Sequence, residues 1–362
     1  MNVDPFLDTS IEWIDNPLEP IDEDRMTKAR ARQNSLTKPP GSLGMLETIA
    51  IRLAGMQGLE APDIKKPAIT VFAADHGVAR HGVSAFPQSV TAEMVRNFSA
   101  GGAAISVLAR SIGARLEVVN VGTMVALEAM NGVVDQRIAA GTADMMTNES
   151  MSEAQFAAAL NSGRAAVERA HDAGADLFIG GDMGIANTTS ATAIACALLD
   201  LPAGDLSGPG TGLNADGVRH KATVITRALV RHRELLKDPF DALRCLGGFE
   251  IAALAGAWIR CAQVRMPMVI DGFISSVAAL VVNTRNPDIG ARMFHSHRSA
   301  EPGHRKVLEA MCVTPLVDFG MRLGEGSGAA VVVPLMRLAC ELHNHMATFS
   351  QAGVSDGSND ST

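Results

Sequence analysis

The sequence predicts an α/β fold in which a doubly wound, mainly parallel sheet carries helices on both faces. Its apolar residues gather in short continuous runs that end on small or acidic residues, at 68–77, 116–122, 175–184 and 267–273. Stretches with helical spacing of their apolar residues, such as 102–113 and 152–174, lie between these runs. Continuous apolar strands that alternate with helices are typical of a parallel sheet buried on both sides.

Local signals predict the helices nearer the two ends. Ser42 follows a proline-glycine turn and is the expected N-cap of a helix whose apolar residues recur between Leu46 and Met56. A last long helix is expected to begin near Ser327 and to be kinked at Pro334.

The two ends of the chain are expected to pack together as a small helical subdomain, formed by residues 1–45 and 335–362. Residues 46–334 are then the large α/β domain. The segment 350–362 is polar and is expected to be a disordered tail.

Composition narrows the class of protein. The chain has 362 residues, is 47% hydrophobic and 19% charged, and contains 34 glycines, 18 methionines and no tyrosine, as expected for a globular α/β protein. A net charge of −8 argues against nucleic acid or an anionic membrane as the main partner. There is no transmembrane run, and the acidic start does not resemble a signal peptide. The scattered cysteines lack any CxxC pair and are expected to be buried free thiols in a reducing cytoplasm: Cys196, Cys245, Cys261, Cys312 and Cys340.

Each predicted strand ends on residues that can contact a ligand. The ends carry Asp75-His76-Gly77, Asn120-Val121-Gly122, Gly181-Asp182-Met183-Gly184 and Asp271-Gly272. Glycine and aspartate also make ordinary turns, so one such end would carry little weight. Four together favour a ligand crevice beyond the carboxyl ends of the strands.

The stretch 320–330, GMRLGEGSGAA, places a lone carboxylate, Glu325, between glycines. Gly324 to Ala329 matches the loose dinucleotide fingerprint GxGxxG/A. That fingerprint requires a first βαβ unit and an acid about 20 residues later, and here the following helix leads only to a polar tail. The alternative is that the glycines let a ligand approach the backbone and that Glu325 is the working group.

Two further stretches suggest an anion site. In GGDMGIANTTSA a strand end passes directly into a helix whose first turn offers Asn187, Thr188, Thr189 and Ser190. Free main-chain N–H groups and the helix dipole favour an anion there, although the same residues are ordinary N-caps. GPGTGLNADGVRHK adds flexible glycines before Arg219 and Lys221. Either cation would suit a phosphate, but a basic pair before a helix is more often a solvated face.

The stretch 295–305, HSHRSAEPGHR, offers His295, His297, Glu301 and His304. No second ligand cluster has zinc-site spacing, so no metal is expected and these are interpreted as polar loop residues near the crevice.

Several stretches taken together resemble the nicotinate-nucleotide:dimethylbenzimidazole phosphoribosyltransferase family of cobalamin lower-ligand biosynthesis. They are LTKPPGSLGMLE, AADHGVARHGVSAFPQSVTAEMV, GDMGIANTTSA, GGFEIAALAGA, VIDGFISSVAAL, SHRSAEPGHR and MRLGEGSGAA, in order from about residue 36 to 345. The resemblance implies a Rossmann-like large domain, a homodimer and no cofactor or metal, with nicotinate mononucleotide and dimethylbenzimidazole as substrates.

The resemblance also implies the chemistry. Such an enzyme transfers phosphoribose to the base, and releases nicotinate and an α-ribazole 5′-phosphate. The catalytic glutamate of the family matches Glu325, which is then the general base. Asp182 stands where many relatives carry glutamate, and its shorter side chain would assist as an acid or orient the ribose.

Binding residues are implied by the same matches. The phosphate would be held by the helix start from Gly184 through Asn187, Thr188 and Thr189, with Gly210 and Lys221. Ser299 matches a substrate contact. The benzimidazole pocket maps to Phe86, Gln88, Met94 and Leu323, although Phe86 and Met94 would equally suit a plain core.

Three alternatives remain open from the sequence. The same transfer could use another acceptor, such as a different benzimidazole, a purine or a phenol. A non-catalytic nucleotide-binding sensor is the second alternative, and the intact Glu325 stretch argues against it. An NAD-dependent oxidoreductase comes last because the fingerprint lies at the wrong end of the chain.

Overall fold

The structure is a computed structural model that describes residues 10–355. Six parallel strands form one sheet in the order β3-β2-β1-β4-β5-β6. The strands are β1 (Pro67–Ala74), β2 (Arg115–Gly122), β3 (Val133–Asp135), β4 (Leu177–Met183), β5 (Met268–Ile270) and β6 (Met293–His295). The strand order reverses between β1 and β4, as it does in dinucleotide-binding folds, and such a switch point opens a crevice at the carboxyl ends.

The two central strands carry apolar side chains on both faces because helices cover both. Phe72 of β1 and Phe178 of β4 point into one core, where Phe178 meets Trp258 edge to face with ring centroids 6.2 Å apart. Val71 and Ile179 point to the opposite side and enter a second core. The expected doubly wound α/β sheet is therefore confirmed.

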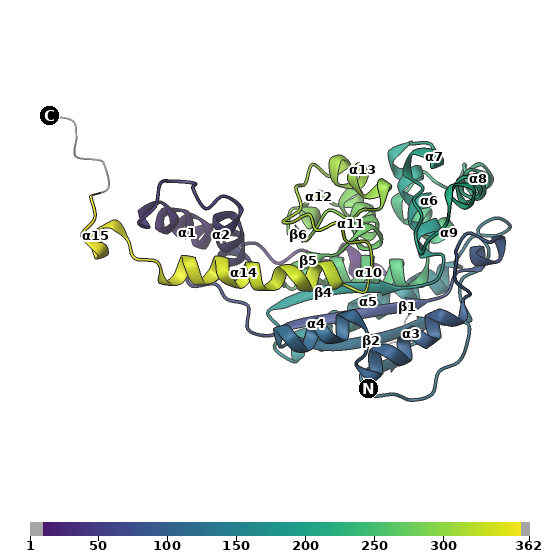
Figure 1. The fold of residues 1–362 in the computed structure, drawn as a ribbon, viewed down its shortest axis with the longest axis horizontal. Helices are drawn as coiled ribbons and strands as arrows, with labels where there is room; N and C mark the ends of the chain where they lie inside the picture. The colour runs from purple at the N-terminus through teal and green to yellow at the C-terminus, as the bar shows by residue number, and fades with distance from the viewer. Residues whose placement is uncertain (1–9, 356–362) are drawn as a thin grey trace.

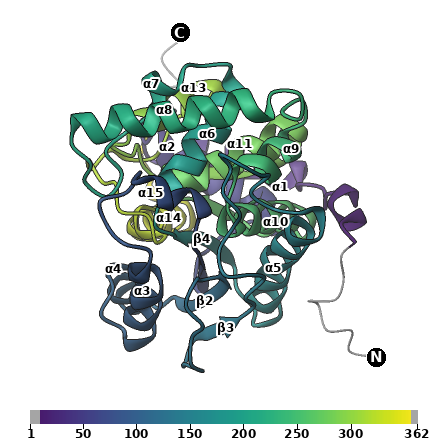
Figure 2. The ribbon, with the colours of Figure 1, turned by 90° about the vertical axis from the view of Figure 1, so that its right-hand side faces the viewer.

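Figure 2 shows the sheet between two groups of helices. The first core lies under α5 (Glu153–Asp172), α10 (Phe249–Gln263) and α11 (Phe273–Arg285). The second lies under α3 (Ser89–Ala100), α4 (Ala104–Ile112) and α14 (Ser327–His345).

A further set of helices packs around α11 and extends the first core (Figure 1). It comprises α6 (Asn187–Leu199), α7 (Ala203–Leu206), α8 (Ala215–His232), α9 (Pro239–Leu246), α12 (Pro287–Gly290) and α13 (Pro302–Ala310). The loops that enter α6, α11 and α13 bring polar residues to the carboxyl edge of the sheet.

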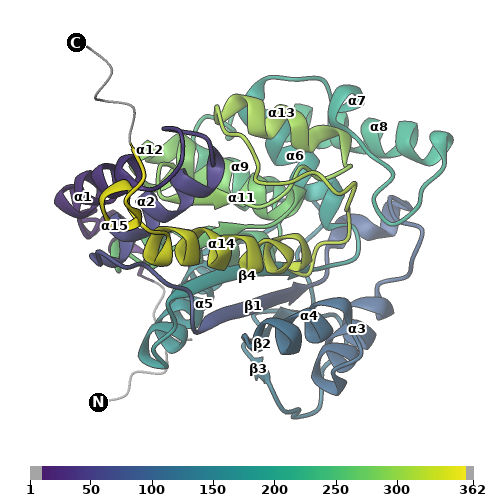
Figure 3. The ribbon, with the colours of Figure 1, turned by 60° about the vertical axis from the view of Figure 1, so that its left-hand side comes forward.

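Helices near the two ends of the described chain, α1 (Glu23–Ser35), α2 (Met45–Gln57) and α14, meet beside the sheet (Figure 3). A short 3-10 turn (Glu12–Asp15) precedes α1 and α2, and α2 packs against α14. Arg32 of α1 donates to the main-chain oxygens of His343 and Asn344, at 2.6 and 2.9 Å. The division into two domains nevertheless stays a prediction, because α14 runs unbroken through Pro334.

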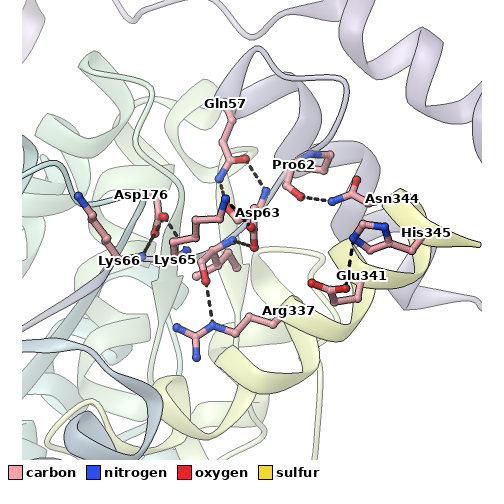
Figure 4. A network of polar contacts seen from close by, with 11 residues as sticks. Gln57, Pro62, Asp63, Lys65, Lys66, Asp176, Arg337, Glu341, Asn344 and His345 are labelled. Carbon is pink, nitrogen blue, oxygen red and sulfur yellow. Dashed lines mark hydrogen bonds and ion pairs between the residues drawn. The ribbon is translucent and has the colours of Figure 1, made fainter.

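Figure 4 shows a second connection between the two ends of the chain. The loop between α2 and β1 is fastened to α14, where Arg337 donates to the Ile64 oxygen at 2.8 Å and Asn344 donates to the Pro62 oxygen at 3.0 Å. Asp176, just before β4, accepts from the main-chain nitrogen of Lys65 at 2.6 Å. The helical ends are thereby fixed to the sheet.

Some local predictions need correction. Ser42 is not an N-cap, because its N–H donates to the Pro39 oxygen inside a turn, and α2 begins three residues later after Gly44. Part of the expected disordered tail is the short helix α15 (Phe349–Ala352), capped by Thr348, and residues 356–362 lie outside the described part. Four cysteines are buried and free as expected, whereas Cys312 is exposed. Among the described helices, none is both long and apolar enough to cross a membrane.

Candidate active site

A cavity of about 320 Å³ opens at the carboxyl ends of β4 and β5. It is walled by the start of α6, the start of α11 and loops around residues 210, 299 and 323. The predicted site residues that line it are Phe86, Asp182, Gly184, Asn187, Thr188, Gly210, Ser299 and Leu323. Segments far apart in the sequence thus converge at the switch point, where the strand ends predict a ligand.

Asp182, at the end of β4, is one of two acidic residues on the cavity wall, and the other is Glu301. Its side chain is 6% exposed and accepts a hydrogen bond from the Asn187 amide at 2.9 Å. Burial raises the pKa of Asp182 well above its usual range, the charges of Asp271 and Glu250 add to this, and the Asn187 hydrogen bond opposes it. Asp182 therefore keeps its proton to a higher pH than an exposed aspartate does.

Glu325 lies beside Asp182 on a strained loop. Gly324, Glu325 and Gly326 all have positive φ, at 87°, 66° and 83°. Glycine adopts this conformation freely, whereas for glutamate it is uncommon and marks a constrained, often functional position. The Glu325 N–H donates to the main-chain oxygen of Asp182 at 3.2 Å, so the loop is fixed to the end of β4.

The Glu325 carboxylate lies behind the cavity wall rather than on it. It accepts from the main-chain nitrogen of Ile105 at 3.2 Å, in the first turn of α4, and the residue is 4% exposed. Burial raises the pKa of Glu325; the Ile105 N–H opposes this shift and the charge of Asp271 reinforces it. The glutamate is a stronger base than an exposed one.

Asp271 supports the Glu325 loop from below. Its carboxylate accepts from the main-chain nitrogens of Gly326 and Ala329, at 3.2 and 2.9 Å. Burial raises the pKa of Asp271, while the charge of His297 and these N–H groups oppose the shift. Asp271 orients the loop through the start of α14, a role that the sequence suggested only as a strand end.

Lys221 of α8 lies behind the end of the cavity that the sequence predicts to bind an anion. This lysine is fully buried and donates to the Thr188 hydroxyl at 2.7 Å and to the Gly208 oxygen at 3.3 Å. Its ammonium group thus lies behind Thr188 and the Gly208–Gly210 loop. Arg219, the other candidate cation, pairs with Asp216 at the surface and does not line the cavity. Thr189 is buried in α6 and does not line the cavity.

The predicted base-binding residues divide into two groups. Phe86 and Leu323 lie at the cavity mouth and are 52% and 57% exposed. Gln88 instead donates to the main-chain oxygen of His76 at 2.9 Å, and Met94 packs against the second core. Neither Gln88 nor Met94 lines the cavity.

A buried network beneath the site was missed by sequence reasoning. His76 lies between Glu250 and the Ser190 hydroxyl, at 2.6 and 2.9 Å, and all three side chains are inaccessible or nearly so. Asp75 accepts from the Thr91 hydroxyl at 2.7 Å, and that hydroxyl accepts from the Ile185 N–H at 3.2 Å. The sequence signals were the pair Asp75-His76 at a strand end and Ser190 in the first turn of a helix, with nothing to join them.

The chain is similar over most of its length to known proteins. A family profile described as phosphoribosyltransferase matches residues 18–354. The nicotinate-nucleotide–dimethylbenzimidazole phosphoribosyltransferase of Pseudomonas putida strain W619 is 55% identical over 344 residues, covering 95% of this chain and 98% of the relative. The protein of that name from Pseudomonas aeruginosa strain LESB58 is 56% identical, covering 96% and 99%.

This chain belongs to the nicotinate-nucleotide–dimethylbenzimidazole phosphoribosyltransferase family. A crystal structure of a family member from Thermus thermophilus matches with a TM-score of 0.87 at 41% identity, and covers 92% of this chain and 99% of that one. The resemblance seen in the sequence is therefore confirmed, and so is the fold that it implied.

The comparisons leave the roles of single residues as predictions. Within residues 10–355, no group of three or more His, Cys, Asp and Glu side chains is arranged to hold a metal ion. His297 and Glu301, interpreted from the sequence as polar loop residues near the crevice, do line the cavity, and so does Arg322, which sequence reasoning did not assign. They come from loops whose meeting point depends on the strand order.

Proposed function

We propose that this protein transfers the phosphoribosyl group of nicotinate mononucleotide to 5,6-dimethylbenzimidazole, and releases nicotinate and α-ribazole 5′-phosphate. The observation that carries the proposal is the identity of 55% over 95% of the chain to a relative that bears this enzyme name. The cavity supports it, because it joins an anion end at Thr188 and Gly210 to an apolar mouth at Phe86 and Leu323.

Glu325 is the general base of the proposed reaction. One benzimidazole nitrogen attacks the ribose C1′ while the other still carries a proton. The new bond makes the ring cationic and that proton acidic, so a nearby carboxylate removes it as the bond forms. The raised pKa of Glu325 suits this task, since a base titrating nearer to neutral pH has a greater driving force for the transfer.

The leaving group needs no acid of its own. The nicotinate ring is a pyridinium in the nucleotide, and takes the electron pair of the breaking C1′–N bond to become neutral. Attack from the opposite face converts the β-nucleotide to an α-riboside, by the inverting logic of glycosidases. Asp182 is proposed to orient the ribose as a protonated donor, in keeping with its raised pKa and its place on the cavity wall.

The phosphate is proposed to lie at the start of α6. Gly184, Asn187 and Thr188 line this end, and Lys221 lies directly behind Thr188. Free N–H groups and the dipole of a helix favour a phosphate there. A homodimer, implied by the family resemblance, and a cytoplasmic location, expected from the composition, are part of the same proposal. Sedimentation of the purified protein tests the dimer.

The proposal is tested by following nicotinate release from nicotinate mononucleotide with and without dimethylbenzimidazole. We expect release that depends on the base, and a rate loss of roughly 10²–10⁴ in Glu325→Gln, typical of a missing general base. Glu341→Gln, an exposed change on α14, the helix that follows the Glu325 loop, is the control and should keep the full rate.

Three other outcomes have distinct meanings. Full activity in Glu325→Gln would remove this residue from the mechanism and direct attention to Asp182. Release with a purine or a phenol but not with dimethylbenzimidazole would favour another acceptor. Nucleotide binding without release with any base would favour a sensor.

A further inference from the structure

Glu301 is a buried acid at the anion end of the cavity. It comes just before α13, is 5% exposed and lines the cavity. One carboxylate oxygen accepts from the Gly210 N–H at 3.1 Å, and the other is buried and has no hydrogen-bond partner. An acid beside a phosphate site repels the ligand, so its presence there requires a reason.

Glu301 and Lys221 hold the same loop from two sides. Lys221 donates to the Gly208 oxygen, and Glu301 accepts from the Gly210 N–H. The unpartnered oxygen of Glu301 lies over Gly208, where an added methyl group would be 2.1 Å from it. At Gly210 an added methyl group would be 3.5 Å from the Lys221 nitrogen.

Lys221 otherwise contacts only neutral oxygens. Within residues 10–355 no ion pair joins it to a carboxylate, and its two acceptors are a hydroxyl and a main-chain carbonyl. A buried ammonium group without a counter-charge tends to lose its proton. Burial lowers the pKa of Lys221 to about 8, and the charge of Glu301 opposes that shift.

The other titratable groups on the packed elements do not take this role. On α8 itself, Asp216 and Arg219 pair with each other at the surface, and His220 donates to the His81 oxygen. Arg322 donates to the Gly210 oxygen from the far side of the loop. On the elements packed against α8, the remaining groups are Cys196 of α6 and Asp205 of α7.

We propose that Glu301 is the internal counter-ion of Lys221, and that it keeps the empty phosphate end charged and in place until the phosphate of the nucleotide supplies the negative charge. Glu301 is thus a positioning residue that acts through Lys221 and the Gly208–Gly210 loop. The inference rests on the proposed function in one respect, namely that the ligand of this end is a nucleotide phosphate.

The proposal predicts different pH dependences for the free enzyme, seen in kcat/KM, and for the substrate complex, seen in kcat. In the free enzyme only Glu301 favours the protonated lysine, so kcat/KM should fall as pH rises through about 8. Without the Glu301 charge the lysine loses its proton at lower pH. In the complex the bound phosphate provides that charge, and kcat should not change its alkaline limb.

Two variants of Glu301 distinguish charge from hydrogen bonding. Glu301→Gln keeps an acceptor oxygen for Gly210 and removes the charge, so the alkaline limb of kcat/KM should move down by about one pH unit while that of kcat stays. Glu301→Asp keeps the charge on a shorter side chain and should leave both limbs in place. Glu309→Gln, at an exposed position of α13, controls for the lost net charge.

A residue that only shapes the loop predicts the reverse. The limbs would then coincide in Glu301→Gln and the natural protein, and Glu301→Asp would raise KM equally at every pH; that pattern overturns the proposal. Lys221→Arg, which remains charged, should abolish the limb, and a limb that persists in a folded Lys221→Arg protein also overturns it. Since both Glu301 variants retain Lys221, their comparison decides the matter even if Lys221→Arg does not fold.

Failure of the proposed function is recognised separately. If the natural protein releases no nicotinate, the same pH series is measured as calorimetric binding of inorganic phosphate. As pH rises, phosphate binding should be lost at a lower pH in Glu301→Gln than in Glu301→Asp. That result supports the counter-ion role independently of the reaction. Equal pH profiles for the two variants overturn it.

Discussion

The α-carbon of Gly181 lies directly against the main chain of Glu325. A methyl group on Gly181 would be 2.3 Å from the Glu325 carbonyl oxygen and 2.7 Å from the Gly326 nitrogen. Both obstacles are backbone atoms, so no side chain can turn away to make room. The central strand β4 thus sets the position of the loop that carries the proposed base.

Gly181→Ala is expected to displace this loop and to lower kcat roughly a hundredfold, because a shift of about 1 Å in a catalytic group costs that much. Overpacking should also lower the free energy of unfolding by about 1–3 kcal/mol. Rate measurements and urea denaturation check both effects. Gly204→Ala is the control, since nothing lies within 4 Å of the added methyl group. An unchanged kcat in Gly181→Ala would show that the loop position does not limit the reaction.

The polar residues at the strand ends could be predicted from the sequence, but which of them lie close together in the fold could not. Asp182 and Asp271 could be predicted as polar strand ends because each directly follows an apolar run, but only Asp182 lines the cavity. The two edge strands β3 and β6 have only three residues each, too short for a periodic signal. The strand order that brings Glu325 against Gly181 depends on long-range packing, which a local pattern does not encode.

The same limit explains the buried partners of the site. Lys221 looked like one half of a solvated basic pair, because its burial depends on α6 and the loop at Gly208. The sequence identifies Glu301 only as a polar loop residue, and its role depends on the hydrogen bond that its carboxylate accepts from the Gly210 N–H. In both cases the motif was visible in the sequence, and the contact that gives it a role was not.

The acid side of the pH profile reports on Glu325. Burial and the charge of Asp271 raise the pKa of Glu325. On acidification, kcat/KM should therefore begin to fall at a pH above the ordinary glutamate value of about 4.3. Asp271→Asn removes the Asp271 charge and should move this acid limb to lower pH. A stopped assay of nicotinate release from pH 4 to 8 measures this. A limb that stays in place, or moves upward, contradicts the electrostatic coupling of the two acids.

Asp182 should make stability depend on pH in an unusual direction. The pKa of Asp182 is raised in the folded state, so the folded protein keeps a proton that the unfolded chain loses above about pH 4. The natural protein should therefore lose stability relative to Asp182→Asn as pH rises. Urea denaturation of both proteins at pH 5 and pH 8 gives the difference. Asp172→Asn, at an exposed end of α5, should show no such trend.

The ion pair of Lys38 and Glu47 joins the segment before α2 to that helix, well away from the cavity. The two groups are 2.7 Å apart, with side chains only 5% and 11% exposed, and Glu47 also accepts from the Leu43 nitrogen at 3.0 Å. Burial opposes the charged form of Glu47, but the hydrogen bonds from Lys38 and Leu43 outweigh it and lower the pKa. Removing one partner leaves the other buried and unpaired, which typically costs about 3–5 kcal/mol.

Lys38→Met alone should therefore destabilise the protein strongly, whereas Lys38→Met combined with Glu47→Leu should recover most of the loss. Denaturation of the two single variants and the double variant gives the coupling between the two side chains. The lowered pKa of Glu47 also fixes how stability depends on pH. The contribution of Glu47 to the free energy of unfolding is present above the ordinary glutamate range and is lost as pH falls through the lowered pKa. Single variants that cost no more than the double variant would mean that the pair is hydrated and adds little to the joint between α1 and α2.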